Sequence, residues 1–439
     1  MISSEPKIKV GIIDRYTEVS GAFREKYKIT EDVVVSGEFR AVVKEGKIIL
    51  YGGKDIELLC AAEIYCRPVN EGEFLLNDVI FGINFHWERK ESQIFQGALH
   101  LIARSDGTLT AVNEISVEKY LASVISSEMS ATAPMDLLKA HAITSRSWLV
   151  AMLEMKKEYS LLGIPSQRTQ RTDEVLIRYY DREDHDLFDV CADDHCQRYH
   201  GITKIISDAA QQAVNETHGI FLVYENKICD ARFSKSCGGI SEPFETTWQE
   251  QHIPYLVPVS CSVQHQYKEI TTEDEAADWI TSSPEAFCNT TDGNILRQIL
   301  PSFDQETTDF FRWKVVYTAE ELSEIVCKKS GIDFGRIENL IPIERGASGR
   351  MTKLKIVGSN KTLIVGKELE IRRWLSKSHL YSSAFIVNKV GDTFILTGGG
   401  WGHGVGLCQI GAAVMAVEGF KAEEIVKHYF KNAELQKLY

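Results

Sequence analysis

The sequence lacks the features that mark membrane-spanning and nucleic-acid-binding chains. No apolar run reaches 18 residues in this chain of 439, so no transmembrane helix is expected. Lys and Arg are not concentrated in any stretch and the formal net charge is −13, which makes nucleic acid and anionic membranes poor partners. A neutral or sugar-like substrate is compatible with this charge. Internal repeats and low-complexity segments are also absent, so a repeat array is not expected.

The cysteines do not form the pattern of a disulfide scaffold. Ten are spread over the chain, and only Cys60 with Cys66, and Cys191 with Cys196, lie close together in sequence. A composition of 44% hydrophobic and 25% charged residues is that of a globular protein, and the length favours two or three domains. The polar first residues lead into the alternating Ile8, Val10 and Ile12, which predicts a strand and not an export signal.

Two strong helical patterns meet at Glu128. Before it, apolar residues recur at i, i+3, i+4, i+7 and i+8, namely Val117, Tyr120, Leu121, Val124 and Ile125. Glu128 continues this stripe, and a carboxylate on an apolar face is costly unless it is paired or functional. A second helix is expected from Pro134 to about Lys157, because Pro suits the first helical position and Asp136 favours the first turn.

The rest of the chain mixes strand and helix patterns. Residues 7–54 and 95–113 alternate like strands, with Asp106-Gly107 as a hairpin turn. Residues 263–375 begin acidic and helix-like and become strand-like, which indicates an inserted lobe. We therefore predict an α+β fold with an N-terminal β-rich module at 1–92, a mixed helical and β-rich catalytic core at 93–262, an inserted α/β lobe at 263–375, and a C-terminal part of the core at 376–439.

A glycine-dense loop lies near the C-terminus. Residues 398–412 read Gly-Gly-Gly-Trp-Gly-His-Gly-Val-Gly-Leu-Cys-Gln-Ile-Gly-Ala. The Lys-Ser/Thr of a phosphate-binding loop and the dinucleotide fingerprint are both missing. So many glycines require a close approach of the backbone to a ligand or to another strand. A buried crossing of strands is the plain alternative, although it does not require Trp401 and His403.

Two motifs carry a resemblance to a known family. One is the run from Ala140 to Trp148, Ala-His-Ala-Ile-Thr-Ser-Arg-Ser-Trp, after a helix that ends in Glu128-Met129; the other is the glycine-dense loop. Together they resemble the signatures of the stage II sporulation protein D and amidase-enhancer family, and the likeness extends over residues 95–439. His141 departs from the Gln that is usual in the first motif.

The resemblance implies a lytic transglycosylase that cuts peptidoglycan glycan strands, with Glu128 in the catalytic position. Most glycosidases need two carboxylates. A lytic transglycosylase uses the 6-hydroxyl of the muramic sugar as nucleophile, so one Glu can serve as acid and then as base. Such a group must carry a proton at the working pH, and burial beside apolar side chains favours the protonated form. The alternative for Glu128 is a helix-end ion pair, with Arg146 as a partner.

A group of Cys and His residues lies between 185 and 200. Two Cys with His within ten positions offer adequate zinc chemistry, although the spacing is not that of a standard zinc finger. The resemblance implies a zinc site on His185, Cys191, His195 and Cys196, with His200 as a substitute. Adjacent His195 and Cys196 can face one ion only in a loop. We expect a structural zinc; a disulfide and two unrelated thiols are the alternatives.

Sugar recognition usually needs aromatic and planar hydrogen-bonding groups. We expect the glycan to be surrounded by Arg146, Ser236, Gly238, Gly239, Trp401, His403 and Gln409. Cys237, within the same loop, is expected to be a small buried residue.

Three functions are compared. The leading hypothesis is the lytic transglycosylase; the second is a non-catalytic module that binds glycan or stimulates a cell-wall amidase, which the His141 departure makes conceivable. The third is a zinc-dependent hydrolase that uses Cys191, His195 and Cys196. A glycan substrate places the protein in the cell envelope, whereas the first residues give no export signal.

Overall fold

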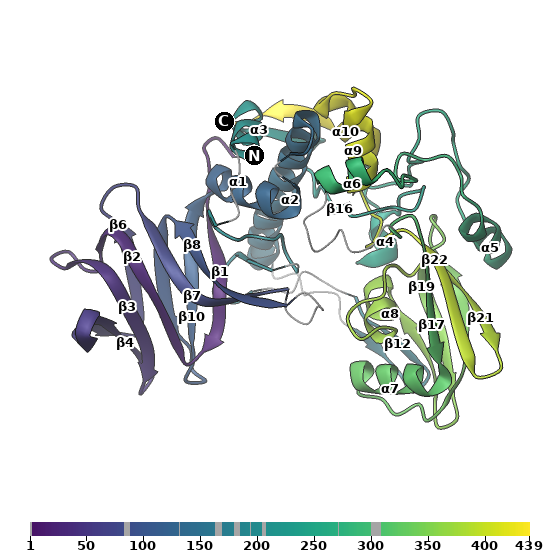
Figure 1. Ribbon diagram of the computed structural model, residues 1–439, viewed down its shortest axis with the longest axis horizontal. Coiled ribbons are helices and arrows are strands. Elements are labelled where there is room, and N and C mark those ends of the chain that lie inside the picture. The colour runs from purple at the N-terminus through teal and green to yellow at the C-terminus, as the bar shows by residue number, and fades with distance from the viewer. Residues whose placement is uncertain are drawn as a thin grey trace. The chain divides into compact units, whose positions relative to one another are not determined.

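The computed structural model describes residues 2–82, 88–130, 132–162, 169–179, 185–193, 195–203, 208–270, 272–299 and 309–439. Its helices and several sheets make an α+β fold, which confirms the predicted class (Figure 1). The chain forms two compact units. Residues 2–132, 184–219 and 438–439 make up one, here called the sheet unit; residues 133–183 and 220–437 make up the other, here called the mixed unit.

A mostly antiparallel sheet dominates the sheet unit, with β13 as its parallel edge strand. It has 11 strands, in the order β13-β1-β10-β9-β6-β2-β3-β4-β5, with β7 paired to β2 and β8. The strands and the short 3-10 helix between two of them are β1 (Lys7–Tyr16), β2 (Glu18–Lys28), β3 (Val34–Lys44), β4 (Lys47–Gly52), η1 (Gly53–Asp55), β5 (Glu57–Ala61), β6 (Glu63–Pro68), β7 (Glu73–Phe81), β8 (Arg89–Gln96), β9 (Ala98–Ala103), β10 (Leu109–Ser116) and β13 (Val190–Cys191). Alternate residues are buried along much of β7, as a strand with one face toward the core requires, whereas β9 and β10 are buried at most positions.

Strand pairing connects segments that the sequence patterns had separated. β9 and β10, expected in the catalytic core, pair with β6 and β1 of the expected N-terminal module. The chain leaves β10 directly into α1 (Val117–Glu128), and α3 (Ala209–Glu216) packs against α1. Residues 204–207, shortly before α3, lie outside the described part of the chain.

The mixed unit combines helices with four smaller sheets. Their strand orders are β11-β12-β20-β19-β18, β15-β14-β24, β16-β23 and β17-β22-β21. The strands are β11 (Gln170–Arg171), β12 (Val175–Ile177), β14 (Ile220–Tyr224), β15 (Lys227–Ile228), β16 (Phe233–Ser234), β17 (Arg312–Thr318), β18 (Ile337–Arg345), β19 (Met351–Gly358), β20 (Thr362–Gly366), β21 (Phe385–Val390), β22 (Thr393–Gly399), β23 (Leu407–Cys408) and β24 (Glu434–Lys437).

Helices surround these sheets (Figure 1). They are α2 (Met135–Leu162), α4 (Phe244–Thr247), α5 (Glu273–Thr281), α6 (Gly293–Ile299), α7 (Ala319–Ser330), α8 (Glu368–Trp374), α9 (Gln409–Val417) and α10 (Ala422–Tyr429). α2 packs against α9, α10 and β14. Its Asp136 accepts a hydrogen bond from the Ala422 backbone N–H at the start of α10, at 3.1 Å. No helix within the described residues is long and apolar enough to cross a membrane.

Candidate functional site

Glu128 is the last residue of α1 and is half-buried. The preceding stripe of Val117, Tyr120, Leu121, Val124 and Ile125 is fully buried, as its spacing predicts. The Glu128 Oε1 accepts a hydrogen bond from the Arg198 backbone N–H at 3.2 Å. The helix therefore ends with a carboxylate at the border of the core, and a second segment of the chain orients it.

Residues 195–200 are anchored against α1 by aromatic packing. The rings of Tyr120 and Tyr199 stack with centroids 5.0 Å apart, and the Tyr199 hydroxyl donates to Asn113 Oδ1 at 2.6 Å. Burial, with the nearby charges of Cys196, Cys191 and Glu128, holds the pKa of Tyr120 well above its usual value. The Cys/His segment and Glu128 thus border the same buried phenol.

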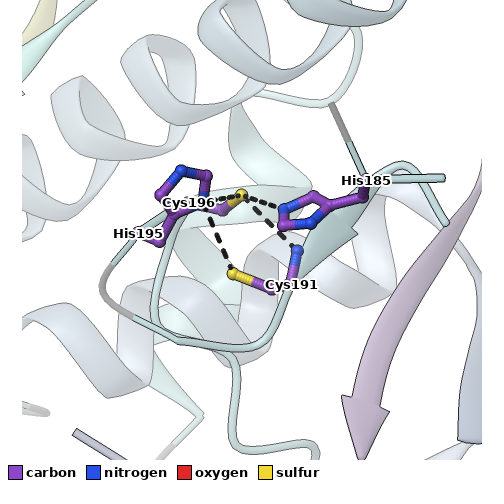
Figure 2. A group of neighbouring side chains, drawn as sticks. All are labelled: His185, Cys191, His195 and Cys196. Atoms are coloured by element: carbon purple, nitrogen blue, oxygen red, sulfur yellow. Dashed lines mark hydrogen bonds between the residues drawn. The ribbon is translucent and has the colours of Figure 1, made fainter. Parts of the chain in front are cut away.

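The structure brings together the four residues predicted as metal ligands. Figure 2 shows the side chains of His185, Cys191, His195 and Cys196 turned toward one another, and their ligand atoms all lie within 4.8 Å of one another. Cys196 Sγ lies 3.4 Å from His185 Nε2 and 3.4 Å from His195 Nδ1, and Cys191 Sγ lies 3.8 Å from His195 Nδ1. His195 and Cys196 lie outside the strands. Adjacent side chains on a strand would point to opposite faces, so a loop is needed for both to face one point.

The sheet holds this group in place. Cys191 ends β13, which pairs in parallel with β1, and the Ala192 backbone N–H donates to the Gly11 carbonyl at 3.0 Å. The His185 ring stacks on Phe188 with centroids 4.5 Å apart. His200 is not one of the four, because its ring packs against Phe81 instead.

The donor set fits a zinc ion. Hydrogen bonds with Cys196, His185 and His195 lower the pKa of the Cys191 thiol despite its burial, which favours the thiolate that binds metals. In a tetrahedral site with Zn–S of about 2.3 Å and Zn–N of about 2.0 Å, ligand atoms lie roughly 3.3–3.8 Å apart. The observed separations of 3.4 Å between Cys196 Sγ and His185 Nε2 and 3.8 Å between Cys191 Sγ and His195 Nδ1 agree with that spacing.

In the mixed unit, the two sequence motifs meet at a buried hydrogen bond. His141 of α2 and Gln409 of α9 are both buried, and their Nε2 atoms lie 3.1 Å apart. His141 Nδ1 lies 3.2 Å from Ser145 Oγ, and its ring contacts Phe233 edge-on. Burial lowers the pKa of His141 to about 3, so the ring is neutral. The residue that replaces the usual Gln therefore still hydrogen-bonds to the second motif.

The glycine-dense loop closes around Arg350. This fully buried guanidinium donates to the carbonyls of Gly402, Cys237 and Ser236 at 3.2, 3.0 and 3.3 Å. A Cβ at Gly404 would lie 2.5 Å from the Arg350 Cζ, which explains why no larger residue fits there. The loop is thus a close crossing of backbones, and the sequence pattern did not identify the cation at its centre.

Arg350 is accompanied by a buried carboxylate. Glu242 Oε1 accepts from the Ser348 N–H and hydroxyl at 2.9 and 2.6 Å, and Oε2 accepts from Thr246 Oγ1 at 2.9 Å. Burial raises the pKa of Glu242, while the charge of Arg350 opposes the shift. Sequence reasoning missed Glu242 because Glu and Arg are usually exposed, and no periodic pattern marks this pair.

The predicted glycan-binding residues differ in accessibility. Trp401 and His403 are partly exposed, whereas Arg146, Ser236, Gly238, Gly239 and Gln409 are buried. The Arg146 guanidinium donates to the Ile220 carbonyl at 3.1 Å, which joins α2 to β14. Trp401 packs between Phe310 and Tyr381, with ring centroids 4.7 and 4.5 Å away. Of the seven predicted residues, five are therefore buried in the mixed unit, and only Trp401 and His403 are partly exposed.

His403 is fixed within the same loop. Its Nδ1 accepts from the Val405 N–H at 3.0 Å, and its ring contacts Trp248 edge-on at 4.8 Å. Burial and the charges of Arg232, Arg372 and Arg350 lower the pKa of His403 well below its usual value. The ring is therefore neutral, and its orientation follows from the hydrogen bond.

Comparisons with known proteins match most of the chain. A family model described as stage II sporulation protein matches residues 105–224, which include Glu128 and the four Cys/His residues, and a domain of unknown function, DUF8618, matches residues 242–406. An uncharacterized protein of Brachyspira hyodysenteriae is 27% identical over 78% of this chain and 72% of its own length. Stage II sporulation protein D of Bacillus subtilis is 25% identical over 74% and 76%, and the amidase enhancer of the same species is 23% identical over 51% and 32%.

Proposed function

The chain belongs to the stage II sporulation protein D and amidase-enhancer family, and from this premise we propose that it is a lytic transglycosylase of peptidoglycan glycan strands. Glu128 is the general acid and base. The observation that carries the proposal is the position of this carboxylate, half-buried at the end of an otherwise apolar helix face and oriented by the Arg198 N–H. A carboxylate that only formed an ion pair at the helix end would need neither partial burial nor a backbone N–H to orient it.

The proposed chemistry uses one carboxyl group twice, first as an acid and then as a base. Protonated Glu128 gives its proton to the glycosidic oxygen as the bond from the muramic C1 to that oxygen breaks. The carboxylate then takes the proton of the sugar's own 6-hydroxyl as its oxygen bonds to C1. The product is a 1,6-anhydro ring, no water is consumed, and Glu128 is protonated again. The Arg198 N–H orients the carboxylate in both steps, because a backbone donor moves little.

Within the mixed unit, considered by itself, we propose a second group of residues for glycan binding. Trp401 and His403 are the partly exposed members of the predicted glycan-binding set, and both lie in the glycine-dense loop. Ser236 pairs with Trp401, and Gly238 lies against Gly400 of that loop. Gly239, Arg146 and Gln409 fix neighbouring segments through contacts with Trp279, Ile220 and His141.

We assign a structural zinc ion to His185, Cys191, His195 and Cys196. Four protein ligands fill a tetrahedral site, whereas a catalytic zinc keeps one position for water or substrate. This argues against a zinc-dependent hydrolase. Removal of the ion with a chelator should lower the thermal midpoint and reduce glycan cleavage only as the folded fraction falls. Loss of cleavage in fully folded protein would instead favour catalytic zinc.

A second function deserves a test because one relative is named amidase enhancer. In that case the chain would bind glycan strands and stimulate a cell-wall amidase without cutting the glycan. Glu128 would then be dispensable for binding.

The test is digestion of purified glycan strands, with and without stem peptides, followed by mass spectrometry of the products. Wild-type protein should release products that end in 1,6-anhydro-muramic acid, and Glu128→Gln should lower the rate at least about 100-fold, the usual contribution of a general acid and base. Gln keeps the carbonyl that accepts from Arg198, so folding should be retained. Glu71→Gln is a control in the same unit, because the Glu71 side chain is 90% exposed.

The outcomes separate the hypotheses. Strand binding without cleavage by either protein, together with stimulation of an amidase, would replace the transglycosylase by the binding module. Equal cleavage by wild type and Glu128→Gln would show that Glu128 is structural.

A further inference from the structure

Four cysteines that are scattered in the sequence meet in the core of the mixed unit. Cys237, Cys261, Cys288 and Cys408 are each at most 2% exposed, and their sulfur atoms all lie within 4.8 Å of one another. They come from different segments: Cys237 follows β16, Cys408 ends β23, and Cys261 and Cys288 lie in the loops on either side of α5. These four residues are here called the four-cysteine cluster.

The spacing fits a single tetrahedral ion. Four thiolates around one zinc at about 2.3 Å have sulfur atoms about 3.8 Å apart. The Sγ atoms of Cys237 and Cys288 are 3.7 Å apart. A disulfide has sulfur atoms about 2.05 Å apart, and all four cysteines are free in the structure. The cluster also lacks the width that bridging irons and sulfides of an iron–sulfur cluster would need.

The surrounding backbone is suited to thiolate ligands. Cys408 Sγ accepts from the Cys237 N–H at 3.3 Å and from the Gly411 N–H at 3.4 Å, at the positive N-terminal end of α9. The Tyr429 hydroxyl lies 3.2 Å from Cys261 Sγ. Hydrogen bonds of this kind orient metal-bound sulfur and offset its charge.

Close packing and a buried cation complete the site. A Cβ at Gly411 would lie 2.6 Å from Cys261 Sγ and 2.2 Å from the Tyr429 hydroxyl, so only Gly lets α9 approach the cluster. The Arg312 guanidinium donates to the Gly238 carbonyl at 3.1 Å, next to Cys237 in the chain. A zinc with four thiolates carries a net charge of −2, which this cation partly balances.

We propose that the four-cysteine cluster holds one structural zinc ion, in addition to the ion assigned to His185, Cys191, His195 and Cys196. The ion fastens the loop of Ser236 to Gly239 to the start of α9 and to the segment around α5. The glycine-dense loop pairs with the same segment through Ser236 and Trp401, so the ion also sets its position. This inference does not depend on the transglycosylase proposal.

The first test measures zinc per chain by elemental analysis of full-length protein purified under reducing conditions. Wild type should contain two zinc ions per chain. Cys288→Ser should contain one, because the ion of the four-cysteine cluster is lost. Cys196→Ser should also contain one, because the ion at the Cys/His group is lost. Cys327→Ser is the matched control, because Cys327 is exposed and outside both groups, and it should retain the wild-type content. Unchanged zinc in folded Cys288→Ser would overturn the proposal.

A second measurement needs no variant, in case Cys288→Ser does not fold. X-ray absorption at the zinc edge of wild type should give an average of three sulfur and one nitrogen ligands, the mean of a site with four sulfurs and a site with two. An average of two sulfur and two nitrogen ligands would show that zinc occupies only the Cys/His group, and would contradict the proposal. Peptides from the freshly purified, denatured protein that link Cys237, Cys261, Cys288 and Cys408 in two disulfides would also contradict the proposal.

Discussion

At the residue scale, His141 shows how a departure from a family motif is accommodated. The imidazole occupies a fully buried position in α2 and reaches Gln409 of α9 through its Nε2. An amide at this position could form an equivalent hydrogen bond, because both groups offer a donor and an acceptor. The motif is therefore better explained by packing of α2 on α9 than by direct contact with substrate.

The buried imidazole predicts a pH dependence of stability. The pKa of His141 is lowered from 6.5 to about 3 by burial, so the unfolded chain binds the proton more readily than the folded protein. The stability that the neutral ring contributes is complete above pH 6.5 and is lost as the pH falls toward 3. At pH 5 this loss is about 2 kcal/mol of unfolding free energy. The drop in unfolding free energy from pH 7.5 to pH 5 should therefore be about 2 kcal/mol smaller in His141→Gln than in wild type.

Urea denaturation of both proteins at the two pH values measures this difference. Contributions of the two proposed zinc sites and of other buried histidines are the same in both proteins and cancel. Parallel loss of stability in wild type and His141→Gln would mean that His141 is protonated or accessible in the folded state.

At the element scale, the glycine-dense loop is explained by the cation that it encloses. Gly404 has a φ of +76° and lies against the Arg350 guanidinium, whereas Gly391, in the turn between β21 and β22, has a φ of +58° and nothing within 4 Å of an added Cβ. Both positions carry the conformational cost of a side chain at positive φ. Only Gly404 also carries a steric cost.

This pair of glycines gives a matched prediction. Gly391→Ala should cost about 1 kcal/mol of unfolding free energy, and Gly404→Ala should cost about 1–3 kcal/mol more, because the methyl group would displace Arg350. Chemical denaturation of the two variants checks the difference. Equal costs would show that Arg350 can move away, and that the loop does not depend on close packing around it.

Local patterns predicted many elements but not their pairing. The burial stripe that ends at Glu128, the start of α2 near Pro134, and the hairpin at Asp106-Gly107 follow from side-chain periodicity and turn chemistry. The pairing of β1 with β10, and of β17 with β22, joins residues far apart in the chain. Such contacts depend on the whole fold, so single-sequence patterns do not contain them.

At the scale of the whole molecule, the same limit applies to the candidate sites. The Cys/His group lies within a dozen residues, so its sequence spacing already indicated shared ligands, and the structure brings those four together. The four-cysteine cluster draws on loops from residue 237 to residue 408, and no local spacing marks it. The pair of Arg350 and Glu242 was missed for the same reason.

The chain also passes between its two units more than once. Residues 184–219 belong to the sheet unit although the segments before and after them belong to the mixed unit. This return brings the Cys/His group and Arg198 to the helix that ends in Glu128. The proposed catalytic residue therefore depends on a segment about 70 residues away in sequence for its orientation.

The most direct test of the proposed function is glycan digestion by the wild-type protein in water enriched in oxygen-18, with mass spectrometry of the new muramic ends. Intramolecular attack by the 6-hydroxyl predicts products that are one water lighter than hydrolytic ends and carry no heavy oxygen. New ends that retain the full mass of water and contain one oxygen-18 atom would show hydrolysis, and would contradict the mechanism assigned to Glu128.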